Sequence, residues 1–301
     1  MKKVFNFLLS IGAAAFCGCA CRNVDAQKSN DKIILWEAHR GGGGFELPES
    51  TPVGFEYAWM LGGTPEADVN MTKDKVIMSL HDGNLKRTAR NVSSDVADKD
   101  ISEMTFAEVK KYDIGNDAYP GQSVPALHEL LQKLADDPEK EIIIDYKNVP
   151  LDLLSALIDK YGVAKQITFA TTDEDIASEF KKLQPYVRIK IWLGGSRERI
   201  MERFRKLAAA NFKGFEQVQL HLNRIADHQN CEWIYGIKPE DLREALEVTQ
   251  KHGVLLQVLP WKFEKKDIFA VLDLGVRSFA VDYPNKFCMI CAEYFAAEWQ
   301  K

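Results

Sequence analysis

The segment Glu141-Ile142-Ile143-Ile144-Asp145-Tyr146-Lys147 indicates the fold most directly. Its three consecutive isoleucines make a short, β-branched, apolar run, which is typical of a strand buried on both faces of a parallel sheet. The run ends in an acid and a base spaced two residues apart, so both side chains point to one side of the strand. The segment therefore predicts an α/β protein with polar residues at the carboxyl ends of its strands.

On either side of this segment, eight other apolar runs are predicted as strands, and most are separated by amphipathic stretches with helical spacing. They are Ile33–Ala38, Pro65–Asn70, Val76–Leu80, Gln166–Ala170, Arg188–Leu193, Phe215–Leu220, Val254–Leu259 and Ser278–Val281. About eight strand–helix units close most naturally into a TIM-type (β/α)8 barrel, with a doubly wound open sheet as the alternative. Since nine strands are predicted, one of them is expected to lie outside the barrel or not to be a strand.

One connection differs from the others. Only Met71-Thr72-Lys73-Asp74-Lys75 separates Pro65–Asn70 from Val76–Leu80. Five residues are too few for a helical crossover, so the second and third strands are predicted to form a β-hairpin.

Length and composition favour one globular domain. The chain has 301 residues, of which 46% are hydrophobic and 28% charged, and this excludes a disordered, collagen-like or coiled-coil chain. The net charge of −5 and pI near 5.8 argue against a nucleic-acid partner, which requires a cationic face. No linker interrupts the chain after about residue 32, so residues 27–301 are predicted to form the domain. No protein partner is implied.

Residues 1–26 have the pattern of an export signal. Two lysines precede an apolar stretch over residues 4–16, which is shorter than the ~20 residues of a membrane-spanning helix. Cleavage after Val24-Asp25-Ala26 would release a soluble protein, whereas a loose lipoprotein box would place a lipid on Cys19, or less favourably on Cys17 or Cys21. The third alternative is an uncleaved anchor. The sequence thus predicts an exported protein, either periplasmic or tethered by lipid to the cell envelope.

Acidic and basic side chains gather at the predicted strand ends. Glu66 and Asp68 lie two residues apart and present two carboxylates together, while His39 and His81 follow the first and third strands. Two adjacent ionised carboxylates require positive charge between them, and a Mg²⁺ or Ca²⁺ ion with oxygen ligands meets that need. The alternatives are a solvated strand face and structural histidines. Taken together with Asp145, these residues favour a metal-assisted acid/base site.

An ordered set of motifs resembles the glycerophosphodiester phosphodiesterase family from about Ile34 to Pro284. The motifs are His39-Arg40-Gly41, Pro48-Glu49-Ser50-Thr51, Glu66-Ala67-Asp68-Val69, Thr72-Lys73-Asp74, His81-Asp82-Gly83-Asn84-Leu85-Lys86-Arg87-Thr88, Pro125-Ala126-Leu127-His128-Glu129 and Asp282-Tyr283-Pro284.

This resemblance implies a TIM-type barrel with a hairpin between the second and third strands, and cleavage of glycerophosphodiesters into glycerol 3-phosphate and an alcohol. It implies that His39 and His81 are the acid/base pair, and that Glu66, Asp68 and Asp145 hold a divalent metal cation. The cations Arg40 and Lys147 are expected to neutralise the phosphoryl oxygens. Trp261, with Trp192, is expected to line the pocket mouth, where an aromatic face can bind a quaternary ammonium group.

Three positions depart from the family pattern. Asp145 stands where the family usually has glutamate, so we expect a long or water-mediated third ligand and a weaker Mg²⁺ site. Ser50 replaces the usual asparagine and changes one supporting hydrogen bond. The glycines at positions 41–44 are interpreted as a mobile spacer, or alternatively as a phosphate cradle.

The sequence leaves several alternatives open. A phospholipase-type enzyme acting on intact lipid shares this barrel, and an exported binding protein without catalysis could retain it. The histidine that acts as base is not specified, nor is the attacking oxygen, which is either water or the glycerol hydroxyl by way of a cyclic phosphate. Cys288 and Cys291 are interpreted as small buried hydrophobic residues in the last helix rather than as metal ligands.

Overall fold

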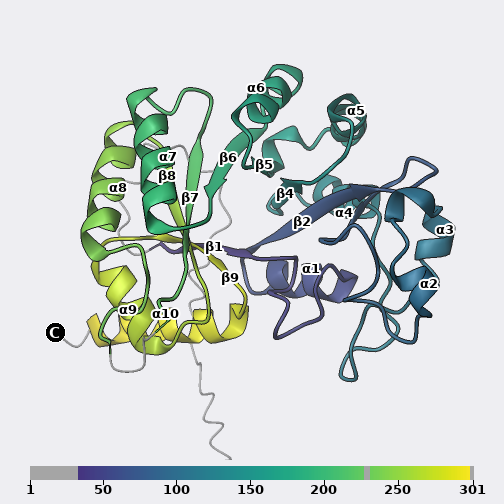
Figure 1. Cartoon of the computed structure of the whole chain (residues 1–301), viewed down its shortest axis with the longest axis horizontal. Coiled ribbons are helices and arrows are strands. Elements are labelled where there is room, and N and C mark those ends of the chain that lie inside the picture. The colour runs from purple at the N-terminus through teal and green to yellow at the C-terminus, as the bar shows by residue number, and fades with distance from the viewer. Residues whose placement is uncertain (1–32, 227–230, 299–301) are drawn as a thin grey trace, which may run out of the picture.

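A closed barrel of parallel strands organises the chain in the computed structural model, which describes residues 33–226 and 231–298 (Figure 1). The sheet order is β1-β9-β8-β7-β6-β5-β4-β2-β3, and an additional β1–β2 pairing closes the barrel. This closure confirms the TIM-type barrel and excludes the open sheet. The strands are β1 (Leu35–Ala38), β2 (Thr64–Met71), β3 (Ile77–Ser79), β4 (Ile142–Tyr146), β5 (Ile167–Thr171), β6 (Arg188–Leu193), β7 (Gln217–Leu222), β8 (Leu255–Pro260) and β9 (Ser278–Val281).

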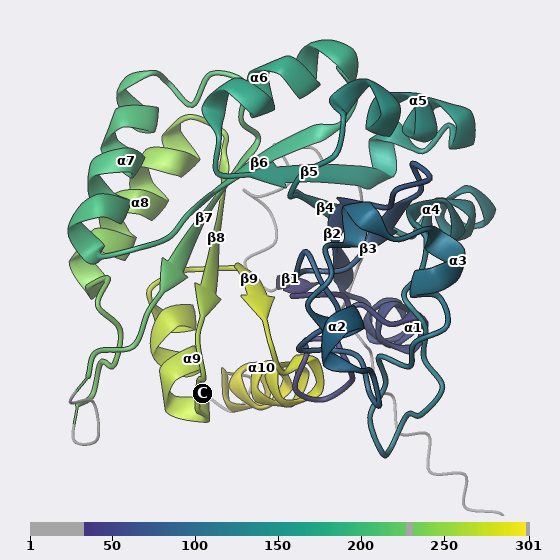
Figure 2. The same ribbon diagram turned by 45° about the vertical axis from the view of Figure 1, so that its right-hand side comes forward.

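Helices cover the outside of the barrel (Figure 2). The helix after β1 begins at a capped residue, because the Thr51 side chain accepts a hydrogen bond from the Gly54 N–H and Pro52 occupies the first turn. The longer helices are α1 (Pro52–Met60), α4 (Leu127–Asp136), α5 (Leu151–Tyr161), α6 (Glu174–Leu183), α7 (Arg197–Ala209), α8 (Pro239–Lys251), α9 (Lys265–Asp273) and α10 (Pro284–Glu298).

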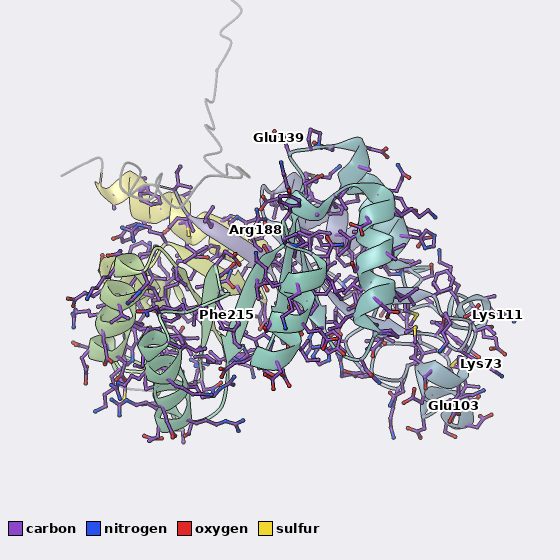
Figure 3. The ribbon with its side chains drawn as sticks, turned by 90° about the horizontal axis from the view of Figure 1, so that it is seen from above. Lys73, Glu103, Lys111, Glu139, Arg188 and Phe215 are labelled. Carbon is purple, nitrogen blue, oxygen red and sulfur yellow. The ribbon has the colours of Figure 1, made fainter. Side chains whose placement is uncertain are left out.

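The predicted hairpin is confirmed, and its second strand is the one outside the barrel. Strand β3 runs antiparallel to β2, with Val69 opposite Ser79. The chain then forms a small lobe with the short helices α2 (Ser94–Ala97) and α3 (Phe106–Val109) and a 3₁₀ turn at Ile101–Glu103. This lobe has its own hydrophobic cluster, which includes Met78, Leu85, Met104 and Val124. In Figure 3, Lys73, Glu103 and Lys111 project from this end of the molecule.

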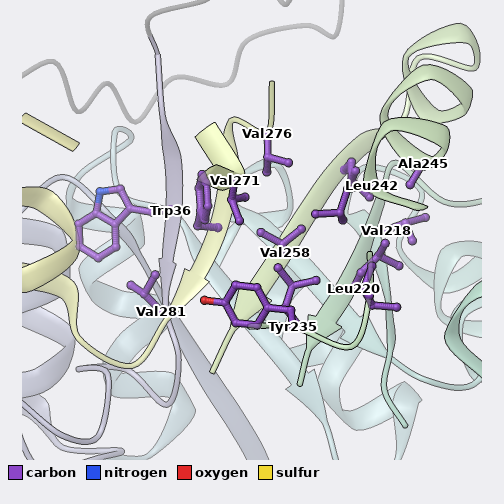
Figure 4. Packing of buried hydrophobic residues seen from close by; sticks show 14 of the residues in the cluster. Trp36, Val218, Leu220, Tyr235, Leu242, Ala245, Val258, Val271, Val276 and Val281 are labelled. Carbon is purple, nitrogen blue, oxygen red and sulfur yellow. The ribbon is translucent and has the colours of Figure 1, made fainter. Parts of the chain in front are cut away.

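The hydrophobic core lies between the strands and the helices. Val218 and Leu220 of β7 and Val258 of β8 belong to one buried cluster with Leu242 and Ala245 of α8 (Figure 4). The side chains between these positions along each strand point into the barrel, because successive residues of a strand face opposite sides. Barrel interiors are usually filled by branched apolar residues, but several interior positions here are polar.

A buried ion pair crosses the barrel interior. The Nζ of Lys190 on β6 lies 2.6 Å from Oε2 of Glu37 on β1, and each side chain is only 1% exposed. Strands β1 and β6 stand four places apart in the sheet order, so the pair joins opposite walls. Glu37 lies two residues before His39, so the two side chains point to the same side of β1. The ion pair forms part of the pocket floor beneath the strand ends.

Two predictions about the chain ends have different outcomes. Among the helices that the structure describes, none is long and apolar enough to cross a membrane. The predicted export signal at residues 1–26 lies outside the described residues. In α10, Cys291 is buried and the partly buried Cys288 packs against the same core, as expected for small hydrophobic residues.

Candidate active site

A pocket opens where the barrel strands end, and all nine residues predicted for the site line it. These are His39, Arg40, Glu66, Asp68, His81, Asp145, Lys147, Trp192 and Trp261. The pocket is also lined by Glu37, Gln219, His221 and Leu259. Residues far apart in the sequence meet here because parallel barrel strands bring their carboxyl ends to one face.

Three buried carboxylates form the centre of the pocket. Glu66 and Asp68 lie on β2, and Asp145 lies on the neighbouring β4 in register with Asp68. One oxygen of each carboxylate lies within 4.8 Å of the others. The short side chain of Asp145 therefore reaches the cluster. The Nζ of Lys147 lies 2.5 Å from Asp145 Oδ2 and 2.9 Å from Asp68 Oδ1.

The cluster carries more negative charge than its neighbours balance. Burial raises the pKa of Asp68, and Glu66 adds to the rise while Lys147 opposes it. Burial likewise raises the pKa of Asp145 against the opposing charge of Lys147. The Oδ2 atom of Asp68 is buried and accepts no hydrogen bond from the described part of the chain. Buried carboxylate oxygens in this arrangement are the ligand type that Mg²⁺ and Ca²⁺ take, so the residues present fit a divalent cation.

His39 is held by an aspartate from the last strand. Its Nδ1 donates to Asp282 Oδ1 at 2.7 Å, and its Nε2 lies 3.9 Å from Glu66 Oε2. Burial lowers the pKa of His39, but the Asp282 hydrogen bond and the nearby carboxylates of Glu66 and Asp68 outweigh it and raise the pKa to about 9. The pairing depends on barrel closure, since His39 follows β1, Asp282 follows β9, and these two strands are neighbours.

His81 is held by the residue next to it. Its Nδ1 lies 2.7 Å from Asp82 Oδ1, and its Nε2 lies 3.1 Å from a guanidinium nitrogen of Arg40. Because a guanidinium only donates, His81 Nε2 is the acceptor and the ring proton is on Nδ1. Both histidines thus direct Nδ1 to an aspartate and Nε2 into the pocket.

A second charge network fixes Asp82 and Arg40. The Arg87 guanidinium donates to both oxygens of Asp82 and to both oxygens of Glu49. Glu49 also accepts from Arg40 Nη1 at 3.1 Å. Forked, two-point contacts of this kind between arginine and carboxylate fix geometry as well as charge. Arg87 therefore ties the side chain that orients His81 to the side chain that holds Arg40.

The opposite wall of the pocket is aromatic. The rings of Trp192 and His221 stack with centroids 5.0 Å apart and an interplanar angle of 3°. Trp261 stands edge-on to His39 at 5.5 Å and to His221 at 5.9 Å. Both tryptophans thus line the pocket as predicted, and Trp192 has a further contact, because its Nε1–H donates to Asp145 Oδ1 at 3.0 Å.

The glycines after His39 serve close packing. A Cβ on Gly42 would lie 2.8 Å from the Gly54 backbone of α1, and one on Gly43 would lie 2.4 Å from Pro284. The interpretation of this stretch as a spacer is therefore wrong for these two positions. Ser50, whose φ is 53°, is buried, and its Oγ has no hydrogen-bond partner in the described chain. The supporting hydrogen bond expected to differ at this position is absent.

Sequence reasoning gave no role to four residues that shape this site. They are Glu49, Asp82, Arg87 and Asp282. Asp282 carried a usable signal, since it directly follows a predicted strand, as the assigned carboxylates follow theirs. The strand pattern gave no signal for Arg87, because it lies in the lobe after β3, where no strand end fixes its direction; only its place in the motif from His81 to Thr88 pointed to it.

The fold and the site define a barrel enzyme, and comparison with known proteins specifies its class. Residues 39–286 match the sequence profile of the Glycerophosphoryl diester phosphodiesterase family, so the chain belongs to that family of phosphoric diester hydrolases. It is 24% identical over 308 residues to a glycerophosphodiester phosphodiesterase of Bacillus subtilis, covering 93% of this chain and 94% of that one. The resemblance read from the motifs is thereby confirmed.

Two further comparisons agree. A glycerophosphodiester phosphodiesterase of Caldanaerobacter subterraneus is 25% identical over 259 residues, covering 82% of this chain and 93% of that one. The crystal structure of a glycerophosphoryl diester phosphodiesterase from Parabacteroides distasonis superposes with a TM-score of 0.65 at 20% identity, covering 92% of each chain. The structural likeness concerns the fold.

Proposed function

We propose that this protein hydrolyses glycerophosphodiesters to glycerol 3-phosphate and an alcohol, using a divalent metal cation and two histidines. One observation carries the proposal: a single pocket combines a buried three-carboxylate cluster with two histidines, each fixed at Nδ1 by an aspartate. Membership of the family and the names of the full-length relatives support this substrate class.

Glu66, Asp68 and Asp145 would hold the cation. When bound, a divalent ion there supplies positive charge that stabilises the phosphoryl oxygens as negative charge develops on them. Lys147 contributes positive charge at the same place, since its ammonium already contacts two of the three carboxylates. Arg40 contributes a second positive group beside His81, and its backbone N–H, 3.0 Å from Glu66 Oε2, orients that carboxylate.

The two histidines would move the protons. One Nε2 removes a proton from the attacking oxygen, and the other donates a proton to the departing alkoxide, so that the alcohol leaves neutral. Asp282 and Asp82 accept from the two Nδ1–H groups, which keeps each Nε2 directed into the pocket. The histidine that acts as the base has a free Nε2, and the one that acts as the acid carries a second proton there. The same pair serves attack by water and attack by the glycerol hydroxyl. Trp261, edge-on to His39, would contact the alcohol end of the substrate.

A substrate panel tests this proposal. Purified protein is incubated with glycerophosphocholine, glycerophosphoglycerol and a lysophospholipid; glycerol 3-phosphate is measured enzymatically, and lysophosphatidic acid by mass spectrometry. We expect glycerol 3-phosphate from the glycerophosphodiesters, and no product from the Asp68→Asn variant. Preferred cleavage of the lysophospholipid would favour a lipid-acting enzyme instead, and no cleavage of any substrate would favour a binding protein. Detection of a cyclic glycerophosphate intermediate identifies the glycerol hydroxyl as the nucleophile.

We also propose that the protein works outside the cytoplasm, in the periplasm or tethered to the cell envelope by a lipid on Cys19. The support is the pattern of residues 1–26, with its basic start and short apolar stretch. Cell fractionation combined with mass spectrometry of the mature N-terminus tests it. A lipid on Cys19, or a start at Gln27, is the expected result, and an intact Met1 in the cytoplasm contradicts it.

A further inference from the structure

We infer that Trp192 is a positioning residue that orients the Asp145 carboxylate within the metal-binding cluster. The inference rests on the metal site of the proposed function. The two Asp145 oxygens have different partners: the Trp192 indole N–H donates to Oδ1 at 3.0 Å, and the Lys147 ammonium lies 2.5 Å from Oδ2. The terminal torsion of an aspartate is broad, so these two partners determine the plane of the carboxylate.

The barrel geometry explains why a tryptophan is needed to make this contact. Trp192 is on β6 and Asp145 is on β4, so β5 lies between them. The β5 residue in register with Asp145 is Ala170, whose small side chain leaves space above it. A long, planar donor can pass over this alanine and reach a carboxylate two strands away.

A chain of hydrogen bonds holds the indole in place. Gln257 Nε2 donates to the Phe279 carbonyl, Gln219 Nε2 donates to Gln257 Oε1 at 2.7 Å, and His221 Nε2 lies 3.3 Å from Gln219 Oε1. A backbone carbonyl can only accept, so it sets the direction of every bond in the chain and assigns the His221 proton to Nε2. His221 then stacks on Trp192.

The state of His221 agrees with this chain. Burial, with added repulsion from the charges of His39 and Lys190, lowers the pKa of His221 to about 3. The ring is therefore neutral at physiological pH, and its one proton is the Nε2 proton donated to Gln219. A neutral ring in a fixed plane supports the Trp192 indole rigidly. The indole N–H in turn fixes the orientation of the Asp145 carboxylate.

Trp261 provides a matched comparison. It lines the same pocket and also contacts His221, edge-on at 5.9 Å. Its indole N–H, however, makes no hydrogen bond to any residue that the structure describes. Replacing either tryptophan by phenylalanine keeps an aromatic ring in the wall, but only the change at Trp192 removes a donor from Asp145.

Calorimetric titration of metal-stripped protein with Mg²⁺ and with Ca²⁺ tests the inference. Loss of a partner that orients a metal ligand typically weakens metal affinity about 10- to 100-fold. We therefore expect Trp192→Phe to bind metal at least about 10-fold more weakly than wild type, and Trp261→Phe to stay within about 2-fold. Equal metal affinity of Trp192→Phe and wild type would overturn the inference, as would a wild-type protein that binds neither ion.

A second measurement covers the case in which Trp192→Phe does not fold. In ¹⁵N-indole NMR spectra, Asp145→Ala should shift the Trp192 N–H resonance and speed its exchange with solvent, while the Trp261 resonance stays in place. An unmoved Trp192 resonance contradicts the inference. Phosphodiesterase activity is assayed separately. Weakened metal binding in Trp192→Phe, in a protein that cleaves no glycerophosphodiester, would overturn the proposed function and support the positioning role.

Discussion

The two walls of the pocket differ in how their polar side chains are paired. On the wall formed by β1, β2 and β4, like charges are pressed together, and Asp68 Oδ2 is left without a hydrogen-bond partner in the described chain. On the wall formed by β6, β7 and β8, polar side chains satisfy one another in an ordered chain that ends at the Phe279 carbonyl. The acidic wall leaves a buried carboxylate oxygen for a ligand, whereas the glutamine and histidine side chains of the other wall bond to one another.

The two walls separate the residues expected to react from those expected to support them. Clustered carboxylates destabilise a fold unless a bound ligand compensates for their repulsion. Such clusters are therefore candidate functional sites. A fully satisfied polar network instead rigidifies its surroundings. We therefore expect changes on the acidic wall to abolish turnover, and changes on the aromatic wall to alter affinity and specificity.

The largest effect is expected at the histidines of the acidic side. His39→Ala and His81→Ala should each lower kcat by about 10²- to 10⁴-fold or more, because a general acid or base contributes about that much. Circular dichroism should stay unchanged. His128→Ala, an exposed histidine on α4, is the matched control and should keep full activity. Wild-type turnover in either pocket variant would remove that histidine from the mechanism.

The next largest effect is expected at the Lys190–Glu37 ion pair, which forms the pocket floor between the two walls. Lys190→Met should lower the free energy of unfolding by about 3–5 kcal/mol, because it leaves the charge of Glu37 buried and unpaired. Burial already raises the pKa of Glu37 to about 7 against the opposing charge of Lys190. Since glutamate in the unfolded chain ionises near pH 4.3, the unfolded state binds fewer protons than the native state above that pH. Between about pH 4.3 and about pH 7 wild type and variant lose stability together, because Glu37 keeps its proton in both native states. The deficit of the variant relative to wild type should therefore grow as pH rises above about 7.

Denaturant unfolding at several pH values measures this effect, and the double variant Glu37→Gln/Lys190→Met is its control. With neither charge present, most of the stability should return. If Lys190→Met alone is as stable as wild type at pH 8, the ion pair does not hold the barrel floor together.

The smallest effect is expected at the aromatic rim. If the face of Trp261 holds a quaternary ammonium, Trp261→Ala should raise KM for glycerophosphocholine by roughly 2- to 30-fold, the equivalent of a cation–π contact of about 0.5–2 kcal/mol. KM for glycerophosphoglycerol should change much less. An equal rise for both substrates means that the indole only covers the end of the barrel.

Much of the fold and the residues of the pocket could be predicted from local pattern. Short β-branched runs located all nine strands, and the five residues between two of them predicted the hairpin. Polar residues at the ends of parallel barrel strands meet at one face, so His39, Glu66, Asp68 and Asp145 could be predicted to share one pocket. These features depend on the alternation and spacing of nearby residues, which a sequence displays.

The unpredicted part depends on closure of the barrel. The bond between His39 and Asp282 joins residues 243 positions apart and requires β9 to lie beside β1. The Lys190–Glu37 pair spans the interior, and the Trp192–Asp145 contact passes over Ala170. Local spacing cannot give such distances, because they follow from the order and tilt of all eight barrel strands. The close approach of Gly42 to Gly54 could not be predicted from the sequence for the same reason.

Hydrolysis by this enzyme should depend on a divalent cation, and restoring activity to chelator-treated protein is the decisive experiment. Wild-type protein is stripped with a chelator and dialysed, and hydrolysis of a glycerophosphodiester is then followed while Mg²⁺ or Ca²⁺ is added back. We expect that stripping abolishes turnover, that added cation restores it in a saturable way, and that Asp68→Asn is not restored at the same cation concentrations. Full activity of the stripped wild-type enzyme, without added cation, would contradict this dependence.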